Sequence, residues 1–247
     1  MEFKFFYHFG NFILMLKGMF SRPENMRMYW KQFMQQCVDI GVGSFGIVFI
    51  ISLFMGGVTT LQTAYQLVSP IIPKSTIAQI VRDTIILEFA PTLTCIVLAG
   101  VIGSKIASEL GNMRISEQID ALEIMGINTK GYLVMPKILA ALLMIPVLVA
   151  IAGFLGIWGG KEAGVLAGII SEDQFLQGLR QDFRAFNVVF AMCKSYTFAF
   201  IISSISAYYG YNVEGGALEI GKASTKAVVV SCILILFADY ALSAILL

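Results

Sequence analysis

The stretch GSFGIVFIISLFMGGVTTLQTAYQLV, residues 43–68, carries no charged side chain. It lies in a longer segment that has no charge between Asp39 and Lys74. A helix needs about 20 consecutive apolar residues to cross the hydrocarbon core of a bilayer. This stretch therefore predicts a membrane-spanning helix, and it decides the class of fold.

Four further stretches of the same kind follow, at about 85–108, 132–158, 186–210 and 226–247. The composition agrees, because 57% of the residues are hydrophobic and only 13% are charged, with a mean hydropathy of +0.80. A soluble domain is about one quarter charged. No internal repeat or low-complexity linker divides the chain. We predict an all-α polytopic membrane protein with five transmembrane helices in a single domain, residues 1–247.

Several classes of function are disfavoured by composition. A net charge of +1 argues against a nucleic-acid partner, which would need a basic surface. With His8 as the single histidine, we expect no metal site, no cofactor and no catalytic residue. The four cysteines lack CxxC spacing and read as packed apolar residues. No phosphate-binding G-x-x-x-x-G-K-[ST] motif is present, so a nucleotide would be bound by a partner chain.

The first 38 residues mix aromatic and basic side chains and contain Pro23, so they do not read as a span. This mixture is typical of an amphipathic helix that lies in the head-group region. We predict an N-terminal interfacial helix over residues 1–38. A helix packed on the bundle is the alternative.

The distribution of positive charge predicts the orientation. If the N-terminus is cytoplasmic, eleven of the 17 Lys and Arg residues lie on the cytoplasmic side and five on the opposite side, with Lys194 inside a span. Basic residues favour the cytoplasmic side. Five spans then place the C-terminus on the other side of the membrane.

The connection between the second and third spans is the most polar part of the middle of the chain, and it predicts a short helix over residues 115–126. Gly111 and Gly126 are expected to bracket that helix, Gly126 as its C-cap. The apolar side chains fall on one helical face and the acidic ones on another: Ile115, Ile119, Leu122 and Met125, against Glu117, Asp120 and Glu123. An acidic face is unsuited to an anionic leaflet, so a soluble protein partner is the better interpretation. A solvated loop helix is the alternative.

Three ionisable residues fall inside predicted spans, where charge is costly and marks a candidate functional site. With the orientation above, Glu88 lies about 5 Å from the outer boundary and Lys194 and Asp239 lie about 12 Å from it. One hypothesis is a polar patch in which Lys194 binds a phosphate. The other is an ion pair of Lys194 with Glu88 or Asp239 that orders the bundle.

Two glutamines of the first span, Gln62 and Gln66, are further candidates. They could line the same cavity or form hydrogen bonds between helices. The glycines of that span permit close helix approach, for which the seam of a dimer is one candidate.

Motifs from the start of span two onward make the sequence resemble the MlaE/YrbE permease family. The resemblance covers roughly residues 40–245 and is most specific at 109–126. The residues that carry it include Glu88-Phe89-Ala90-Pro91, Glu109-Leu110-Gly111, Glu117-Gln118-Ile119-Asp120-Ala121-Leu122, Tyr132-Leu133-Val134, Pro136-Lys137 and Lys194-Ser195. The chain departs from the family at Leu87 and Val101, where the family often has arginine.

The resemblance implies a permease subunit of an ABC transporter that moves phospholipid between the inner membrane and a periplasmic MCE-domain protein. It implies a homodimer that binds two cytoplasmic ATPase subunits and holds lipid between its two copies. It also implies that 115–126 is the coupling helix that docks on the ATPase. The candidate coupling residues are Ile115, Glu117, Gln118, Asp120, Leu122 and Glu123. The candidate lipid-binding residues are Glu88, Lys194, Asp239, Gln62 and Gln66.

Three alternatives stay open at this point. The chain could be an ABC permease for another hydrophobic compound, or a non-transporting membrane anchor that recruits a soluble protein. An intramembrane enzyme is disfavoured, because the spans lack a paired nucleophile and base. We therefore expect the chain not to be an enzyme, with the ATPase activity residing in a partner.

Overall fold

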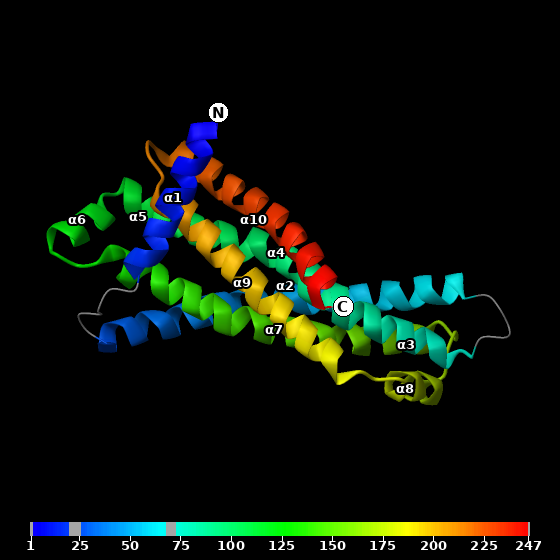
Figure 1. Ribbon diagram of the computed structural model, residues 1–247. Helices are drawn as coiled ribbons and strands as arrows, with labels where there is room; N and C mark the ends of the chain where they lie inside the picture. The colour runs from blue at the N-terminus through cyan, green and yellow to red at the C-terminus, as the bar shows by residue number, and fades with distance from the viewer. Residues whose placement is uncertain (1, 20–25, 68–72, 247) are drawn as a thin grey trace. The chain divides into compact units, whose positions relative to one another are not determined.

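A computed structural model describes residues 2–19, 26–67 and 73–246, and within these ranges the chain is helical with no β-strand (Figure 1). Three short π-helical segments, labelled η, interrupt the α-helices. The elements are α1 (Glu2–Met19), α2 (Met26–Gln66), α3 (Ser75–Thr84), η1 (Ile85–Leu93), α4 (Thr94–Leu98), η2 (Ala99–Gly103), α5 (Ser104–Ile115), α6 (Gln118–Ile124), η3 (Lys130–Val134), α7 (Met135–Leu166), α8 (Glu172–Arg180), α9 (Ala185–Tyr211) and α10 (Ala217–Leu246).

Five continuous helical stretches are long and apolar enough to cross a membrane: Met26–Gln66, Ser75–Ile115, Lys130–Leu166, Ala185–Tyr211 and Ala217–Leu246. Each overlaps one of the five predicted spans over most of its length, so the prediction of an all-α polytopic membrane protein is confirmed. The helices extend beyond the apolar runs at most of their ends. Hydropathy detects the hydrocarbon-crossing part alone, whereas backbone hydrogen bonding carries a helix past the membrane boundary.

The N-terminal region differs from the single interfacial helix that the sequence predicts over residues 1–38. Of residues 1–38, the structure describes 2–19, which form α1, and 26–38, which begin α2. Residues 1 and 20–25, with Pro23, lie outside the described residues. From Met26, α2 runs into the first span without a break. The aromatic and basic residues from Met26 to Val38 therefore extend a spanning helix. The location of α1 at the membrane interface stays a prediction.

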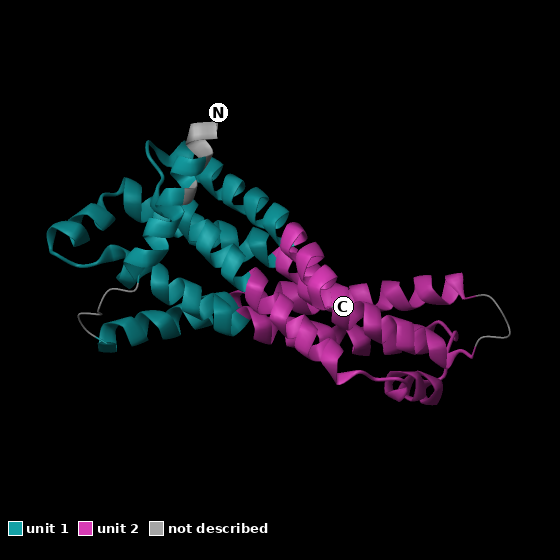
Figure 2. Cartoon of the chain, in the orientation of Figure 1, with its two compact units in different colours: residues 1–42, 98–144, 199–235 teal, residues 43–97, 145–198, 236–247 magenta. Residues whose placement is uncertain are grey.

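The chain forms two compact units, each built from parts of all five long helices (Figure 2). Unit 1 comprises residues 1–42, 98–144 and 199–235, and unit 2 comprises residues 43–97, 145–198 and 236–247. The connections 116–129 and 212–216 belong to unit 1, and those at 73–74 and 167–184 belong to unit 2. Connections predicted on the same side of the membrane thus fall in the same unit.

In unit 2, α2 and α7 pack at backbone contact. A Cβ on Gly56 would overlap the carbonyl oxygen of Gly156, and one on Gly159 would overlap that of Leu53. Small residues permit such close helix packing in membranes. Gly56 therefore serves a contact within the chain, whereas nothing lies within 4 Å of a Cβ at Gly43 or Gly46.

A second pair of helices in unit 2, α3 and α8, packs around Phe175, which is fully buried with Ala78 and Ile170. Figure 1 shows the two helices side by side. The buried guanidinium of Arg82 donates to the carbonyl oxygens of Leu179 and Gln181, each at 2.8 Å. These carbonyls lie at the C-terminal end of α8, where a helix leaves acceptors without partners. Arg82 thus fixes α8 on α3.

Candidate functional site

The three ionisable residues predicted inside the spans come together in unit 2. Lys194 on α9 places its Nζ 2.6 Å from Oδ1 of Asp239 on α10 and 3.0 Å from Oε2 of Glu88 on η1. The Lys194 side chain is 1% exposed, against 13% for Asp239 and 46% for Glu88. Both ion pairs considered from the sequence are therefore formed at once. We call these three residues the Lys194 cluster.

The backbone of η1 also contacts Lys194. In an α-helix the carbonyl of Leu87 would accept from the N–H of residue 91, but Pro91 has no N–H. Lys194 Nζ donates to this carbonyl oxygen at 3.2 Å. The chain around Glu88 is π-helical from Ile85 to Leu93, and such segments recur at functional sites. The Glu-x-x-Pro motif thus presents a carboxylate and a carbonyl to one ammonium.

Two further contacts hold the cluster. The Thr92 hydroxyl donates to Oδ1 of Asp239 at 3.2 Å, and the Lys194 Nζ lies 4.7 Å from the ring centre of Phe190. Thr92 is one turn beyond Glu88 on η1, so the same segment contacts both carboxylates. With all three groups ionised, the cluster carries one negative charge in excess. A buried ammonium with two anionic partners can lose one and keep the other.

The glutamines predicted as lipid-binding candidates lie elsewhere. Gln62 and Gln66 are exposed on α2 and are outside the Lys194 cluster. Thr59, Thr60 and Thr63 on the same helix are buried, and the first two donate to α2 carbonyls one turn earlier. Hydroxyls satisfied in this way do not need a partner helix.

Unit 2 also contains an apolar pocket with a volume of about 190 Å³. Its lining residues come from η1, α7 and α9 and are all apolar, among them Ile86, Phe154 and Met192. The helical segments η1 and α9 thus contribute both to the Lys194 cluster and to an apolar pocket.

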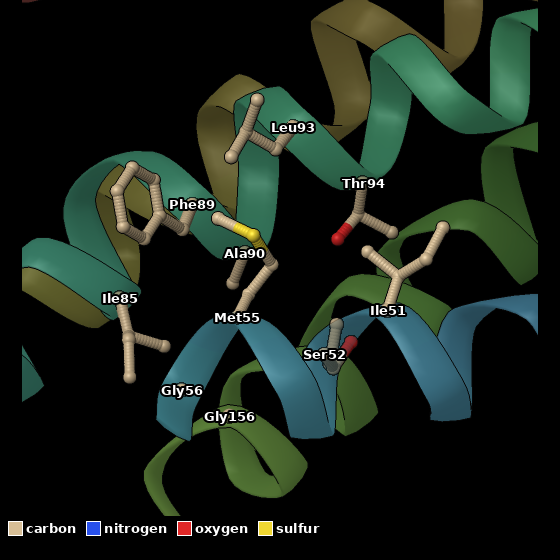
Figure 3. Close-up of a pocket in the computed structure, with 11 residues that line it drawn as sticks. Ile51, Ser52, Met55, Gly56, Ile85, Phe89, Ala90, Leu93, Thr94 and Gly156 are labelled. Carbon is tan, nitrogen blue, oxygen red and sulfur yellow. The ribbon is translucent and has the colours of Figure 1, made fainter. Parts of the chain in front are cut away.

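A second apolar pocket in unit 2 lies against α2, η1 and α7, with Phe89, Met55 and Leu93 around it (Figure 3). Its volume of about 20 Å³ is close to that of one water molecule. The pocket is too small for a lipid chain, and it follows from the small residues Ser52, Ala90 and Gly156 in its wall.

The helix predicted over residues 115–126 is shorter in the structure. α6 covers Gln118–Ile124, and Ile115 is the last residue of α5. Glu117 separates the two helices in a left-handed conformation, with φ of 59°. Gly111 lies inside α5 and does not bracket the helix. The spacing of apolar residues did not reveal this interruption, because a left-handed residue other than glycine cannot be recognised from its residue type.

The end of α6 follows the prediction. Gly126 has a φ of 81°, its N–H donates to Glu123 O, and Ile127 N–H donates to Leu122 O. These two bonds form a Schellman motif, for which glycine is the preferred residue. Gly126 is confirmed as the residue that ends the helix.

The acidic residues of this region have different surroundings. Asp120 pairs with Arg114 at 2.6 Å, and Glu117 is exposed. The Tyr211 hydroxyl donates to Glu123 at 2.8 Å and is the main reason that the pKa of this carboxyl lies below its ordinary value. The Thr129 hydroxyl, at 3.0 Å, acts in the same direction.

The apolar side chains of α6 also divide. Ile119 is fully buried and anchors the helix, and Leu122 is partly buried. Ile124 and Met125 are 88% and 67% exposed. The polar residues Glu117 and Gln118 are exposed beside them. The tip of the segment thus combines acidic and apolar side chains, which suits a protein partner.

Sequence reasoning missed several of these residues. Ile124 did not belong to the predicted apolar face, because that face assumed a continuous helix from Ile115 onward. Thr92 and the Leu87 carbonyl carry no separate sequence signal, since their contacts depend on how η1 packs. In the described part of the chain, no group of His, Cys, Asp and Glu side chains could hold a metal ion.

The chain resembles known membrane transport proteins over almost its full length. The family model described as "Permease MlaE" matches residues 33–245. A protein of Rickettsia bellii named "Probable ABC transporter permease protein" is 37% identical over 213 residues, which cover 86% of this chain and 82% of the relative. A protein of Synechocystis with the same description is 32% identical, covering 94% and 85%.

A plant relative lies further away. "Protein TRIGALACTOSYLDIACYLGLYCEROL 1, chloroplastic" of Arabidopsis thaliana is 32% identical over 217 residues, which cover 88% of this chain and 62% of the plant protein. Both the Lys194 cluster and the segment 115–126 lie inside the region that the family model matches.

Proposed function

Since this chain belongs to the MlaE permease family and is a permease subunit of an ABC transporter, we propose that its substrate is phospholipid. Family membership implies ATPase partner subunits. In our proposal the chain acts as a homodimer in the inner membrane and exchanges phospholipid with a periplasmic MCE-domain protein. ATP hydrolysis in the separate subunits drives the exchange.

The Lys194 cluster is the observation that carries the proposal. An ionised lysine inside an apolar span is costly, and intramembrane ionisable residues mark substrate or ion pathways. Here an ammonium lies beside two carboxylates, and η1 and α9, which carry Glu88 and Lys194, also line an apolar pocket of about 190 Å³. A phospholipid offers a phosphate for the ammonium and an acyl chain for such a pocket.

Glu88 and Asp239 have different roles in this scheme. Asp239 is 13% exposed, accepts from Thr92 and holds Lys194 in place. Glu88 is 46% exposed and can leave Lys194 at a smaller cost. A lipid phosphate then replaces Glu88 as the partner of Lys194. When Glu88 returns to Lys194, the lipid is released.

The name of the plant relative supports a lipid substrate, because that protein is named for trigalactosyldiacylglycerol, a glycolipid. The two relatives from bacteria are named for transport without a substrate. Like the glycolipid in the plant protein's name, a phospholipid is an amphiphile. It therefore matches both the charge and the apolar surface of unit 2.

The segment 115–126 is the coupling segment in our proposal. Its exposed apolar tip, Ile124 and Met125, enters a groove of the ATPase, and the exposed Glu117 and Gln118 contact the rim. Ile119 transmits the movement, since it is the buried anchor of α6. This placement puts unit 1 on the cytoplasmic side with the N-terminus, and the C-terminus in the periplasm.

Lipid mass spectrometry of the transporter, purified in mild detergent with its ATPase, tests the substrate. We expect stoichiometric phospholipid with the wild-type chain and a loss of it in K194M. The matched control is K161M, because Lys161 also contacts two carboxylates in unit 2, those of Glu162 and Glu172. A different amphiphile, or equal phospholipid in K194M, would overturn the assignment.

The coupling role has its own test. Glu117→Lys reverses a charge on an exposed side chain, so the fold should persist. We expect less ATPase to copurify with this variant and lower ATP hydrolysis, with normal levels of the chain in the membrane. Unchanged hydrolysis would place the contact elsewhere, and a chain that binds no ATPase at all would be a membrane anchor.

A further inference from the structure

Unit 1 contains a pocket that plays no part in the proposed transport. It has a volume of about 370 Å³ and lies where α1, the end of α9 and the start of α10 meet. Ligand sites in proteins have volumes of about 300–1,000 Å³. The pocket is therefore large enough for the head group of a lipid.

The walls of this pocket carry a balanced set of charges. Two lysines, Lys222 and Lys226, face it together with two glutamates, Glu214 and Glu219. His8 also lines the pocket. A pocket with equal numbers of fixed positive and negative groups favours a ligand that carries both charges over one with a single sign.

The two lysines can both contact a ligand. Lys222 pairs with Glu219 at 2.6 Å, but the side chains are 63% and 44% exposed, so the pair costs little to open. The Nζ of Lys226 lies 5.4 Å from the ring centre of Tyr209, and no acid of the described residues lies within ion-pair distance of it. Phosphate oxygens are stronger partners for an ammonium than a ring face.

The opposite wall is fixed by aromatic residues. The Nδ1 of His8 lies 2.8 Å from the Tyr208 hydroxyl, and the rings of Phe12 and Tyr208 meet edge to face, with centres 5.8 Å apart. Tyrosine and lysine at the ends of spanning helices are typical of the membrane interface, where head groups lie. The pocket thus lies at the depth of the lipid head groups, which are the ligands that its charges fit.

We propose that this pocket binds the head group of a zwitterionic phospholipid with a phosphate and a primary ammonium. The phosphate contacts Lys222 and Lys226, and the ammonium contacts Glu214 and Glu219. The site is separate from the Lys194 cluster and does not depend on the proposed transport. A bound head group would join α10 to α1 through His8, and so hold the N-terminal helix on unit 1.

The test uses the full chain purified with its ATPase in mild detergent. Binding of glycerophosphoethanolamine, inorganic phosphate and glycerophosphoglycerol is measured by calorimetry, and phosphatidylethanolamine and phosphatidylglycerol are added separately in native mass spectrometry. The wild-type chain should bind the ethanolamine compounds most tightly. Equal binding of inorganic phosphate would show a site for free phosphate, and stronger binding of the glycerol compounds would show an anionic-lipid site. Either result overturns the proposal.

Variants separate the two charges of the head group. K222M/K226M should weaken binding of the ethanolamine compounds about tenfold for each charge-assisted hydrogen bond lost. E214Q/E219Q should weaken the ethanolamine compounds and leave the glycerol compounds unchanged. K31M, which replaces an exposed lysine on α2, serves as the control that should bind normally. Glu214, Lys222 and Lys226 are exposed and Glu219 is partly exposed, so folding should persist in these variants. The melting midpoint checks this. Unchanged binding in both double variants would refute the site.

Discussion

Two buried lysines, one in each unit, are held in different ways. Lys194 in unit 2 has two carboxylate partners and a backbone carbonyl. Lys137 in unit 1 is completely buried, and its Nζ lies 2.6 Å from Oε2 of Glu109, its one ion-pair partner among the described residues. Removal of one partner therefore leaves Lys194 paired but leaves Lys137 alone. The first arrangement permits exchange of partners, and the second fixes a structure.

The surroundings of the two lysines agree with this difference. Lys137 lies in the first turn of α7, at the start of a span, and the exposed pair Lys105–Asp39 is also in unit 1. Lys194 lies well inside α9, a helix that also lines an apolar pocket. A charge near a helix end can reach the interface more easily than one near the middle of a span.

The largest expected effect on stability is that of Glu109→Gln. It leaves the Lys137 ammonium buried without an anion, and loss of one partner of a buried pair costs about 3–5 kcal/mol. Glu88→Gln should cost much less, because Asp239 still neutralises Lys194. Reversible unfolding in mixed micelles measures both free energies.

A double variant checks the cause. E109Q/K137M removes both charges, so it should recover most of the stability that E109Q loses. If E88Q costs as much as E109Q, the two lysines are held in the same way and the contrast between the units fails.

Asp239→Asn should have the second largest effect, a loss of roughly 1–3 kcal/mol, because it removes the less exposed partner of Lys194. Glu88, the more exposed of the two carboxylates, is then the ion-pair partner that remains for the ammonium. The same unfolding experiment measures this variant beside E88Q. Equal losses for the two variants would mean that Asp239 and Glu88 do not differ in role.

Thr92→Val tests the support of Asp239. The substitution keeps the shape of the side chain and removes one hydrogen bond of 3.2 Å, so it should cost about 0.5–1.5 kcal/mol. In a D239A background, which has no side-chain acceptor for Thr92, the same change should have no further effect, which a double-mutant cycle would reveal. An additive cost would show that Thr92 stabilises the helix by another route.

The smallest effect concerns Glu123, a carboxylate held by neutral donors in place of a lysine. Its folded pKa lies below its ordinary value, so its contribution to stability is complete above that ordinary value and is lost as the pH falls through the folded pKa. Tyr211→Phe removes the main donor. The loss of stability on acidification below about pH 4.3, the usual glutamate pKa, should become smaller in this variant. An unchanged pH profile would show that Tyr211 does not stabilise the carboxylate.

The sequence predicted the spans because membrane helices must be long and apolar, a property that each residue reports by itself. It also placed Glu88, Lys194 and Asp239 at comparable depths, since a helix advances by a fixed rise per residue. It did not say that both ion pairs of Lys194 would form at once. That outcome depends on how η1, α9 and α10 pack.

In the segment 115–126, the sequence predicted one end of the helix and not the other. Its C-terminal end was predictable, because a left-handed residue that ends a helix is usually glycine. Its start was not, because the left-handed residue there is Glu117, which composition does not distinguish from a helical one. The division of residues 1–38 between α1 and α2 likewise depends on backbone continuity across Met26–Val38, where polar and apolar residues are mixed.

The most direct test of the central claim is ATP-driven transfer of phospholipid from proteoliposomes that contain the permease and its ATPase. The rate is compared for wild type, K194M, K137M and K161M, at equal protein levels and equal ATPase content. We predict that K194M falls to the rate without ATP, whereas K137M and K161M stay close to wild type. A wild-type rate of transfer in K194M would contradict a role for Lys194 in binding lipid.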